Sequence, residues 1–245
     1  MEEKKEWFGE WFDSPYYHVL YKDRDYTEAR NFIDHLIDHL HLNPSHKILD
    51  LACGKGRHSI YLNSKKMNVV GLDLSESNIK YANQFSNECL KFFQHDMRLL
   101  YSNNEFDFVL NMFTSFGYFK STNENQIAID NMAATLKPKG KLVLDFLNPY
   151  KVIHYLTPEE VVIKEGIEFH ITKEVDEQDY IIKTIRFNAD GTDHTFYEKV
   201  KAIRKAEFLD YFKNAHLSLV SIFGDYELNP YDCDVSERMI FIVEK

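Results

Sequence analysis

The feature that most constrains this chain is a short apolar run that ends beside an acidic residue and opens into a glycine loop and a helix. The run covers 47–51, Asp50 lies within it, and Ala-Cys-Gly-Lys-Gly follows, with Gly54 and Gly56. Glycine permits left-handed backbone and close approach to a ligand, while a helix N-terminus offers free N–H groups. This arrangement is typical of doubly wound α/β sheets that bind a nucleotide-containing ligand.

Strand and helix patterns alternate on both sides of this loop. Short, almost continuous apolar runs favour parallel strands that are buried on both faces. The predicted strands cover 47–51, 67–72, 89–94, 106–111, 141–147, 217–223 and 238–244. The predicted helices cover 57–66, 75–87, 123–136 and 205–214, and a turn at 137–140 closes the third of them.

A different periodicity interrupts this pattern between residues 160 and 203. Apolar Ile167, Phe169 and Ile171 alternate with polar residues, which predicts strands that are exposed on one face. Asp190-Gly191 is a strong hairpin-turn signal. We therefore expect an antiparallel block of three or four strands inserted into the α/β domain.

The first twenty-one residues are rich in aromatic side chains, including Tyr17 and Tyr21. Large aromatic surfaces gain stability from burial, so we expect this arm to dock on the protein. A helix follows, with Asp25 and Glu28 as its predicted capping box. The predicted division is 1–44 as an arm and helix acting as a lid, 45–159 plus 204–245 as the binding domain, and 160–203 as the inserted subdomain.

Acidic residues follow the second and third predicted strands. Asp73 ends the second strand, where a carboxylate accepts hydrogen bonds from both ribose hydroxyls of a bound cofactor in doubly wound sheets. Ser75 can cap the next helix instead of Asp73. Asp96 and Met97 follow the third strand, where an adenine amino group and ring could be bound. Each signal is also compatible with an ordinary loop carboxylate.

The order of these motifs resembles the class I S-adenosylmethionine-dependent methyltransferases. The glycine motif, the ribose acid, the adenine pair and the segment after strand four all have counterparts here. Within the class, Cys-Gly-x-Gly-Arg-His-Ser is similar to small-molecule members of the tellurite-resistance and sugar N-methyltransferase kind. The resemblance implies a Rossmann-like seven-stranded sheet of order 3-2-1-4-5-7-6, with the last strand antiparallel and an inserted antiparallel β-sheet.

The resemblance also implies S-adenosylmethionine as cofactor and a small-molecule acceptor methylated on nitrogen or oxygen. Arg57 could reach the methionyl carboxylate or only lie at the helix start. The implied cofactor-binding residues are Asp50, Ala52, Gly54, Gly56, Arg57, Asp73, Leu74, Asp96, Met97, Asn111 and Phe113. The candidate catalytic residues are Tyr17, Tyr21, Asn111 and Tyr118.

Composition narrows the alternatives. The formal net charge of −10 argues against nucleic acid as a partner, and so against an RNA methyltransferase. Three unpaired cysteines and the absence of a signal or transmembrane pattern predict a cytoplasmic protein without metal. A homodimer through the inserted sheet is a further expectation. The competing functions are a nicotinamide-dependent dehydrogenase, which Asp50 and Ser59 disfavour, and a cofactor-binding module without turnover.

Overall fold

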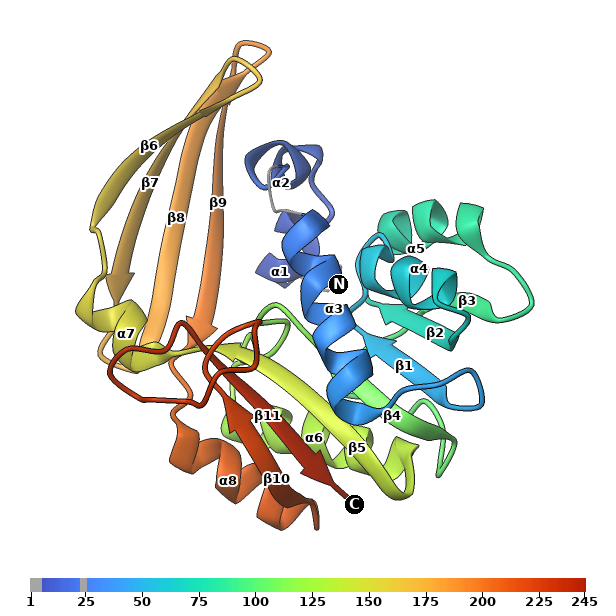
Figure 1. Ribbon diagram of the computed structural model, residues 1–245. Coiled ribbons are helices and arrows are strands. Elements are labelled where there is room, and N and C mark those ends of the chain that lie inside the picture. Colours follow the sequence, from blue (N-terminus) through green and yellow to red (C-terminus); the bar gives the residue numbers. More distant parts are fainter. Residues whose placement is uncertain (1–5, 23–25) are drawn as a thin grey trace. The chain divides into compact units, whose positions relative to one another are not determined.

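A computed structural model describes residues 6–22 and 26–245, and the chain divides into two compact units. The first unit contains 1–24 and 152–202, and the second contains 25–151 and 203–245. Figure 1 shows the elements of both units. In the described part of the chain, every helix is too short or too polar to cross a membrane.

The second unit is built on a seven-stranded sheet. Its order is β10-β11-β5-β4-β1-β2-β3, and β11 is antiparallel to both of its neighbours. The other pairs are parallel. This confirms the predicted fold class, strand order and antiparallel last strand. The strands are β1 (Lys47–Leu51), β2 (Asn68–Asp73), β3 (Leu90–Gln94), β4 (Phe106–Asn111), β5 (Leu136–Leu147), β10 (Ser218–Phe223) and β11 (Arg238–Glu244).

Helices cover both faces of this sheet (Figure 1). One face carries α3 (Tyr26–Leu40), α4 (Arg57–Ser64) and α5 (Glu76–Ala82), and the other carries α6 (Thr122–Thr135) and α8 (Lys205–Asn214). Phe32, Ile33 and Leu36 form the buried apolar side of α3. The predicted cap Asp25 lies outside the described residues.

Two predicted boundaries were wrong. The turn predicted at 137–140 lies within β5. Helix α6 ends at Thr135, and β5 starts at the next residue. The β4–β5 register shifts in this stretch, Pro138 has no N–H to donate, and Lys139 has a left-handed φ of 65°. The chain therefore bulges within the strand. The helix predicted over 75–87 is shorter, and a 3₁₀ turn η1 (Asn83–Phe85) follows α5.

The first unit contains the inserted sheet, whose four strands pair in the order β6-β7-β8-β9. All its pairs are antiparallel, as predicted. Asp190 and Gly191 have φ of 52° and 75°, so they form the tight β8–β9 turn that their sequence indicated. The strands are β6 (Glu159–Lys164), β7 (Ile167–Val175), β8 (Tyr180–Ala189) and β9 (Thr192–Lys201), preceded by α7 (Pro149–His154).

The aromatic arm packs on this inserted sheet. It forms two short helices, α1 (Trp7–Trp11) and α2 (Pro15–Leu20). Trp11 is fully buried in one apolar cluster with side chains of β7 and β8. The arm and the inserted sheet therefore share one core, whereas α3 belongs to the second unit.

Candidate active site

The loop between β1 and α4 has the backbone that its glycines indicated. Ala52, Gly54 and Gly56 have φ of 63°, 55° and 81°, all in the left-handed region. A Cβ added at Gly56 would lie 2.7 Å from the Phe92 ring, whereas a Cβ at Gly54 would meet nothing within 4 Å. Gly56 is thus required by packing, and the backbone at Gly54 borders open space that a ligand could occupy.

Asp50 of β1 accepts a hydrogen bond from the first turn of α4 in the second unit. Its carboxylate is almost fully buried and accepts a hydrogen bond of 2.5 Å from Ser59 Oγ. Burial raises the pKa of Asp50 to about 6, against the opposing effect of the Ser59 hydrogen bonds. The structure therefore gives Asp50 an anchoring contact, and a direct contact with cofactor stays a prediction.

Asp73 lies at the end of β2 and faces the glycine loop. Its Oδ2 accepts from the Gly54 N–H at 2.7 Å, and its Oδ1 accepts from the Ser75 N–H at 2.9 Å. Ser75 caps α5 by accepting from the Asn78 N–H. An ionised carboxylate accepts several hydrogen bonds at once, so these N–H contacts hold the Asp73 carboxylate beside the glycine loop. These residues fit a ribose, and Leu74 beside them is 39% exposed.

Asp96 is held by its own neighbour. Arg98 donates to it from its backbone N–H at 2.8 Å and from Nη2 at 2.7 Å, and Nη1 of the same guanidinium bonds Glu124 at 3.0 Å. Burial raises the pKa of Asp96, but these hydrogen bonds outweigh it and hold the pKa below its usual value. An adenine amino group would have to share this carboxylate with Arg98.

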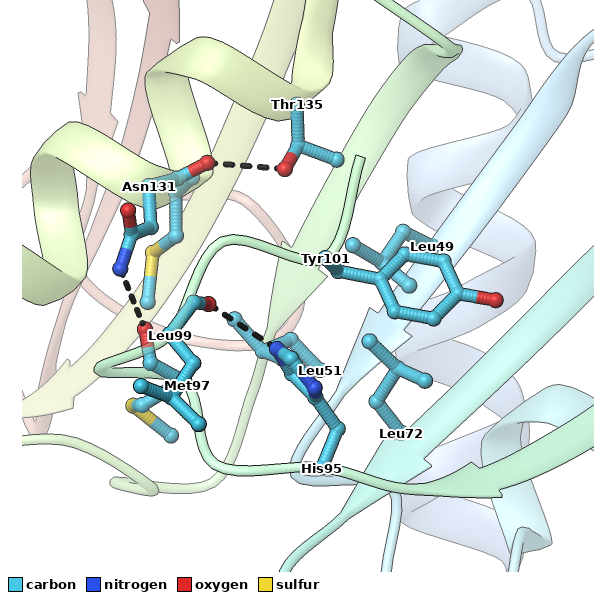
Figure 2. Close-up of a pocket in the computed structure, with 10 residues that line it drawn as sticks. Leu49, Leu51, Leu72, His95, Met97, Leu99, Tyr101, Asn131 and Thr135 are labelled. Carbon is cyan, nitrogen blue, oxygen red and sulfur yellow. Dashed lines mark hydrogen bonds between the residues drawn. The ribbon is translucent and has the colours of Figure 1, made fainter. Parts of the chain in front are cut away.

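Met97 lines a small, mainly apolar pocket between the sheet and α6 (Figure 2). Leu51 of β1 and Leu72 of β2 contribute to it, and Asn131 of α6 donates to the Met97 carbonyl at 3.3 Å. Figure 2 also shows His95 beside the Leu99 carbonyl, at 2.9 Å, which closes the loop on itself. The loop after β3 is therefore fixed by its own contacts and by α6.

Asn111 joins the ends of β4 and β1. It is fully buried, and its Nδ2 donates to the Leu51 carbonyl at 3.1 Å. Its Oδ1 has no hydrogen-bond partner among the described residues. A buried acceptor without a partner is costly, so this oxygen is a natural contact for a donor group next to the glycine loop.

Phe113 lies two residues after Asn111 and forms an aromatic wall with His58 and Tyr226. Phe113 stacks on His58 at a centroid distance of 4.9 Å and lies 5.0 Å from Tyr226. The Arg57 guanidinium lies 4.5 Å from the centroid of the Phe113 ring, and its Nε donates to His58 Nε2. Arg57 therefore contacts this wall at the start of α4.

Sequence reasoning missed a buried polar hub beneath the aromatic wall. Asp145 of β5 is fully buried and accepts from the Phe113 N–H at 2.7 Å, from Tyr226 Oη at 3.2 Å and from Arg238 Nε at 2.8 Å. Arg238 Nη2 also donates to Thr114 Oγ1 at 2.8 Å. The only sequence signal for this hub is an acidic residue within an apolar strand.

The environment of this region shifts three further pKa values. Burial lowers the pKa of His58 well below its usual value, with Arg57 adding to the effect, so the imidazole is neutral at pH 7. Burial and the nearby Asp145 raise the pKa of Tyr226. Burial alone would lower the pKa of Arg238, but the attraction of Asp145 raises it. The hub is thus an ion pair surrounded by neutral rings.

The four candidate catalytic residues fall in different units. Asn111 and Tyr118 lie in the second unit, where Tyr118 Oη donates to the Thr114 carbonyl. Tyr17 and Tyr21 lie in the first unit, where Tyr21 Oη donates to Glu198 at 2.6 Å. A catalytic role for any of them stays a prediction.

Comparison with known proteins identifies the class. Residues 48–140 match the methyltransferase domain family model. YqeM of Bacillus subtilis (strain 168), a protein named provisionally as a methyltransferase, is 37% identical over 109 residues, covering 43% of this chain and 44% of YqeM. The dTDP-3-amino-3,4,6-trideoxy-alpha-D-glucopyranose N,N-dimethyltransferase of Streptomyces venezuelae is 34% identical over 98 residues, covering 40% of this chain and 41% of that enzyme.

The likeness in structure extends over almost the whole chain. An S-adenosylmethionine-dependent methyltransferase from Clostridium acetobutylicum ATCC 824 superposes with a TM-score of 0.78 at 22% identity, covering 94% of this chain and 95% of that one. The chain spans about half the length of the curated relatives it matches. Residues 48–140 therefore match the methyltransferase domain family, and the chain has the fold of the S-adenosylmethionine-dependent methyltransferases. This confirms the class indicated by the motif order.

Proposed function

We propose that the protein is an S-adenosylmethionine-dependent methyltransferase that acts on a small-molecule acceptor. The observation that carries this proposal is the meeting of the open glycine loop at Gly54 with the Asp73 carboxylate, within a domain of the methyltransferase family. Asp73 would accept the ribose hydroxyls, exposed Leu74 would contact the adenine, and the loop would approach the methionyl part.

The chemistry needs little from acid–base groups. Bound S-adenosylmethionine would supply a methyl group activated by a sulfonium. An acceptor nitrogen or oxygen would bond to that methyl carbon in line while the carbon–sulfur bond breaks and the thioether leaves. The chain's own task is to align the acceptor and to exclude water. The aromatic wall of Phe113, His58 and Tyr226 suits this task, because its rings are uncharged and it is fixed by the hub below it.

An amino group on a small, sugar-like molecule is the acceptor that we favour. Support comes from the Streptomyces venezuelae relative, whose name gives an amino sugar nucleotide as substrate. His58 is no candidate for removing the amine proton, because burial lowers its pKa and its Nε2 already accepts from Arg57 Nε.

Calorimetry with three ligands tests the proposal. We expect S-adenosylmethionine and S-adenosylhomocysteine to bind, and NAD neither to bind nor to compete. Binding of NAD alone would favour the dehydrogenase alternative and contradict the proposal. Release of S-adenosylhomocysteine in the presence of a panel of amino sugars and their nucleotides then separates an enzyme from a binding module without turnover.

A further inference from the structure

Phe113 and Thr114 have an unusual backbone. Both have φ of 58°, so two consecutive residues with side chains lie in the left-handed region, and one of them is β-branched. Such a conformation costs free energy and persists only where surrounding contacts impose it. Thr114 is buried, so water does not supply those contacts.

The hub supplies them. Asp145 accepts the Phe113 N–H through Oδ2, and its backbone carbonyl accepts the Thr114 N–H at 3.1 Å. Arg238 holds Thr114 Oγ1 while its Nε bonds Asp145 Oδ1. One residue of β5 thus fixes both left-handed N–H groups, and Arg238 of β11 fixes the carboxylate that does so.

We propose that Asp145 is a positioning residue that acts through Phe113 on the methyl-donor site. The inference rests on the proposed function. A cofactor whose ribose lies at Asp73 on β2, on one side of β1, directs its other end toward β4, which is the strand on the other side of β1. Phe113 is the second residue after this strand, so its ring orientation shapes the place where the sulfonium would lie.

A double-mutant cycle measures whether Asp145 acts through Phe113. The first variant is Asp145→Asn/Arg238→Gln, which breaks the hub without leaving a buried charge. The second is Phe113→Ala, and the third combines all three substitutions. With S-adenosylmethionine as the probe in calorimetry, we expect each of the first two to weaken binding about tenfold. The combination should bind no more weakly than Phe113→Ala alone.

A matched control uses the ion pair at the other end of β4. Lys137 Nζ bonds Asp107 at 2.8 Å, so Asp107→Asn/Lys137→Gln removes a more exposed Lys–Asp pair, and we expect unchanged affinity. If the hub variant does not fold, Tyr226→Phe decides, because it removes only the hydroxyl bonded to Asp145. Its loss of affinity should be a few-fold and should vanish in the Phe113→Ala background.

The outcomes separate the two claims. A wild-type protein that binds neither S-adenosylmethionine nor S-adenosylhomocysteine contradicts the proposed function. A wild-type protein that binds them, with losses from the hub and from Phe113 that simply add, overturns the positioning role and leaves the function standing. The same holds if the hub variant or Tyr226→Phe binds as tightly as the wild type.

Discussion

The two sides of the candidate site are held together in different ways. On the β1–β2 side, Asp50 is bonded by Ser59 and Asp73 by Gly54 and Ser75, all within nineteen residues along the chain. On the β4–β5 side, Asp145 is bonded by Tyr226 and Arg238, which are 81 and 93 residues away. The first side is built from a local motif, and the second depends on the completed fold.

This difference predicts different effects of mutation. On the local side, Asp73 is only partly buried and lies beside the open loop backbone at Gly54, so its loss should mainly affect the ligand. The carboxylate on the long-range side is fully buried and paired, so its loss should mainly affect folding. The following predictions test that contrast, from the largest expected effect to the smallest.

Asp73→Ala should reduce the affinity for S-adenosylhomocysteine more than any other single change on the local side. The two hydroxyl hydrogen bonds expected at this carboxylate contribute about 1.5–3 kcal/mol each. Calorimetry measures the loss, and Asp73→Asn should be intermediate because it keeps one acceptor oxygen. Glu76→Ala, which removes an exposed acidic residue from the first turn of α5, is the control. Unchanged affinity in a folded Asp73→Ala protein would place the ribose elsewhere.

Asp145→Ala should lower the free energy of unfolding by about 3–5 kcal/mol, because it leaves the Arg238 guanidinium buried without its counter-charge. Asp107→Ala breaks an ion pair that is more exposed, and should cost about 1 kcal/mol or less. Urea unfolding followed by circular dichroism is the suitable measurement, since both tryptophans lie in the first unit. Equal losses for the two variants would contradict the contrast.

The same contrast explains how much could be predicted from the sequence. Hydrophobic periodicity and the positions of turn residues identified the α/β sheet, its insertion and the loop from Gly54 to Gly56, because those signals are local. The hub of Asp145 could not be predicted, because its partners come together only when β11 pairs with β5. The buried state of His58 was missed for the same reason, since Phe113 stacks on it from the loop after β4. The role of each predicted cofactor residue stays a prediction.

A pH series on Asp50→Asn tests the local side further. The folded-state pKa of Asp50 is raised from 3.8 to about 6, so the folded protein holds this proton more tightly than the unfolded chain. Ionisation therefore costs stability as pH rises from about 4 to about 6, reaching about 3 kcal/mol above that range. Asp50→Asn should not show this loss, so its stability relative to wild type should rise over this interval.

Asp107→Asn provides a control of opposite sign for that series. Burial raises the pKa of Asp107, but the bonds from Lys137 and the Lys47 N–H outweigh it and hold the pKa below its usual value. Its ionised form therefore stabilises the fold at neutral pH, and that contribution is lost as pH falls through the lowered pKa. If the free energies of unfolding of the wild-type protein and of Asp50→Asn change in parallel between pH 4 and pH 7, the raised pKa of a buried Asp50 is contradicted.

The smallest effect is expected at a long-range hub in the first unit. Glu198 Oε1 accepts from Trp11 Nε1 at 2.7 Å and from Tyr21 Oη at 2.6 Å, although both donors are more than 170 residues away. Glu198→Ala should lower the stability of this unit by about 1–2 kcal/mol, because it leaves the indole N–H of a fully buried tryptophan without its acceptor. Tryptophan fluorescence reports this unit alone, and its emission should move to longer wavelength in the variant. Glu168→Ala on the exposed face of β7 is the matched control and should change neither property.

Because Trp11 is fixed in this way, we expect slow hydrogen exchange over residues 7–21 with and without S-adenosylhomocysteine, as for a static arm. Protection that appears only when the ligand is added would instead support the predicted lid.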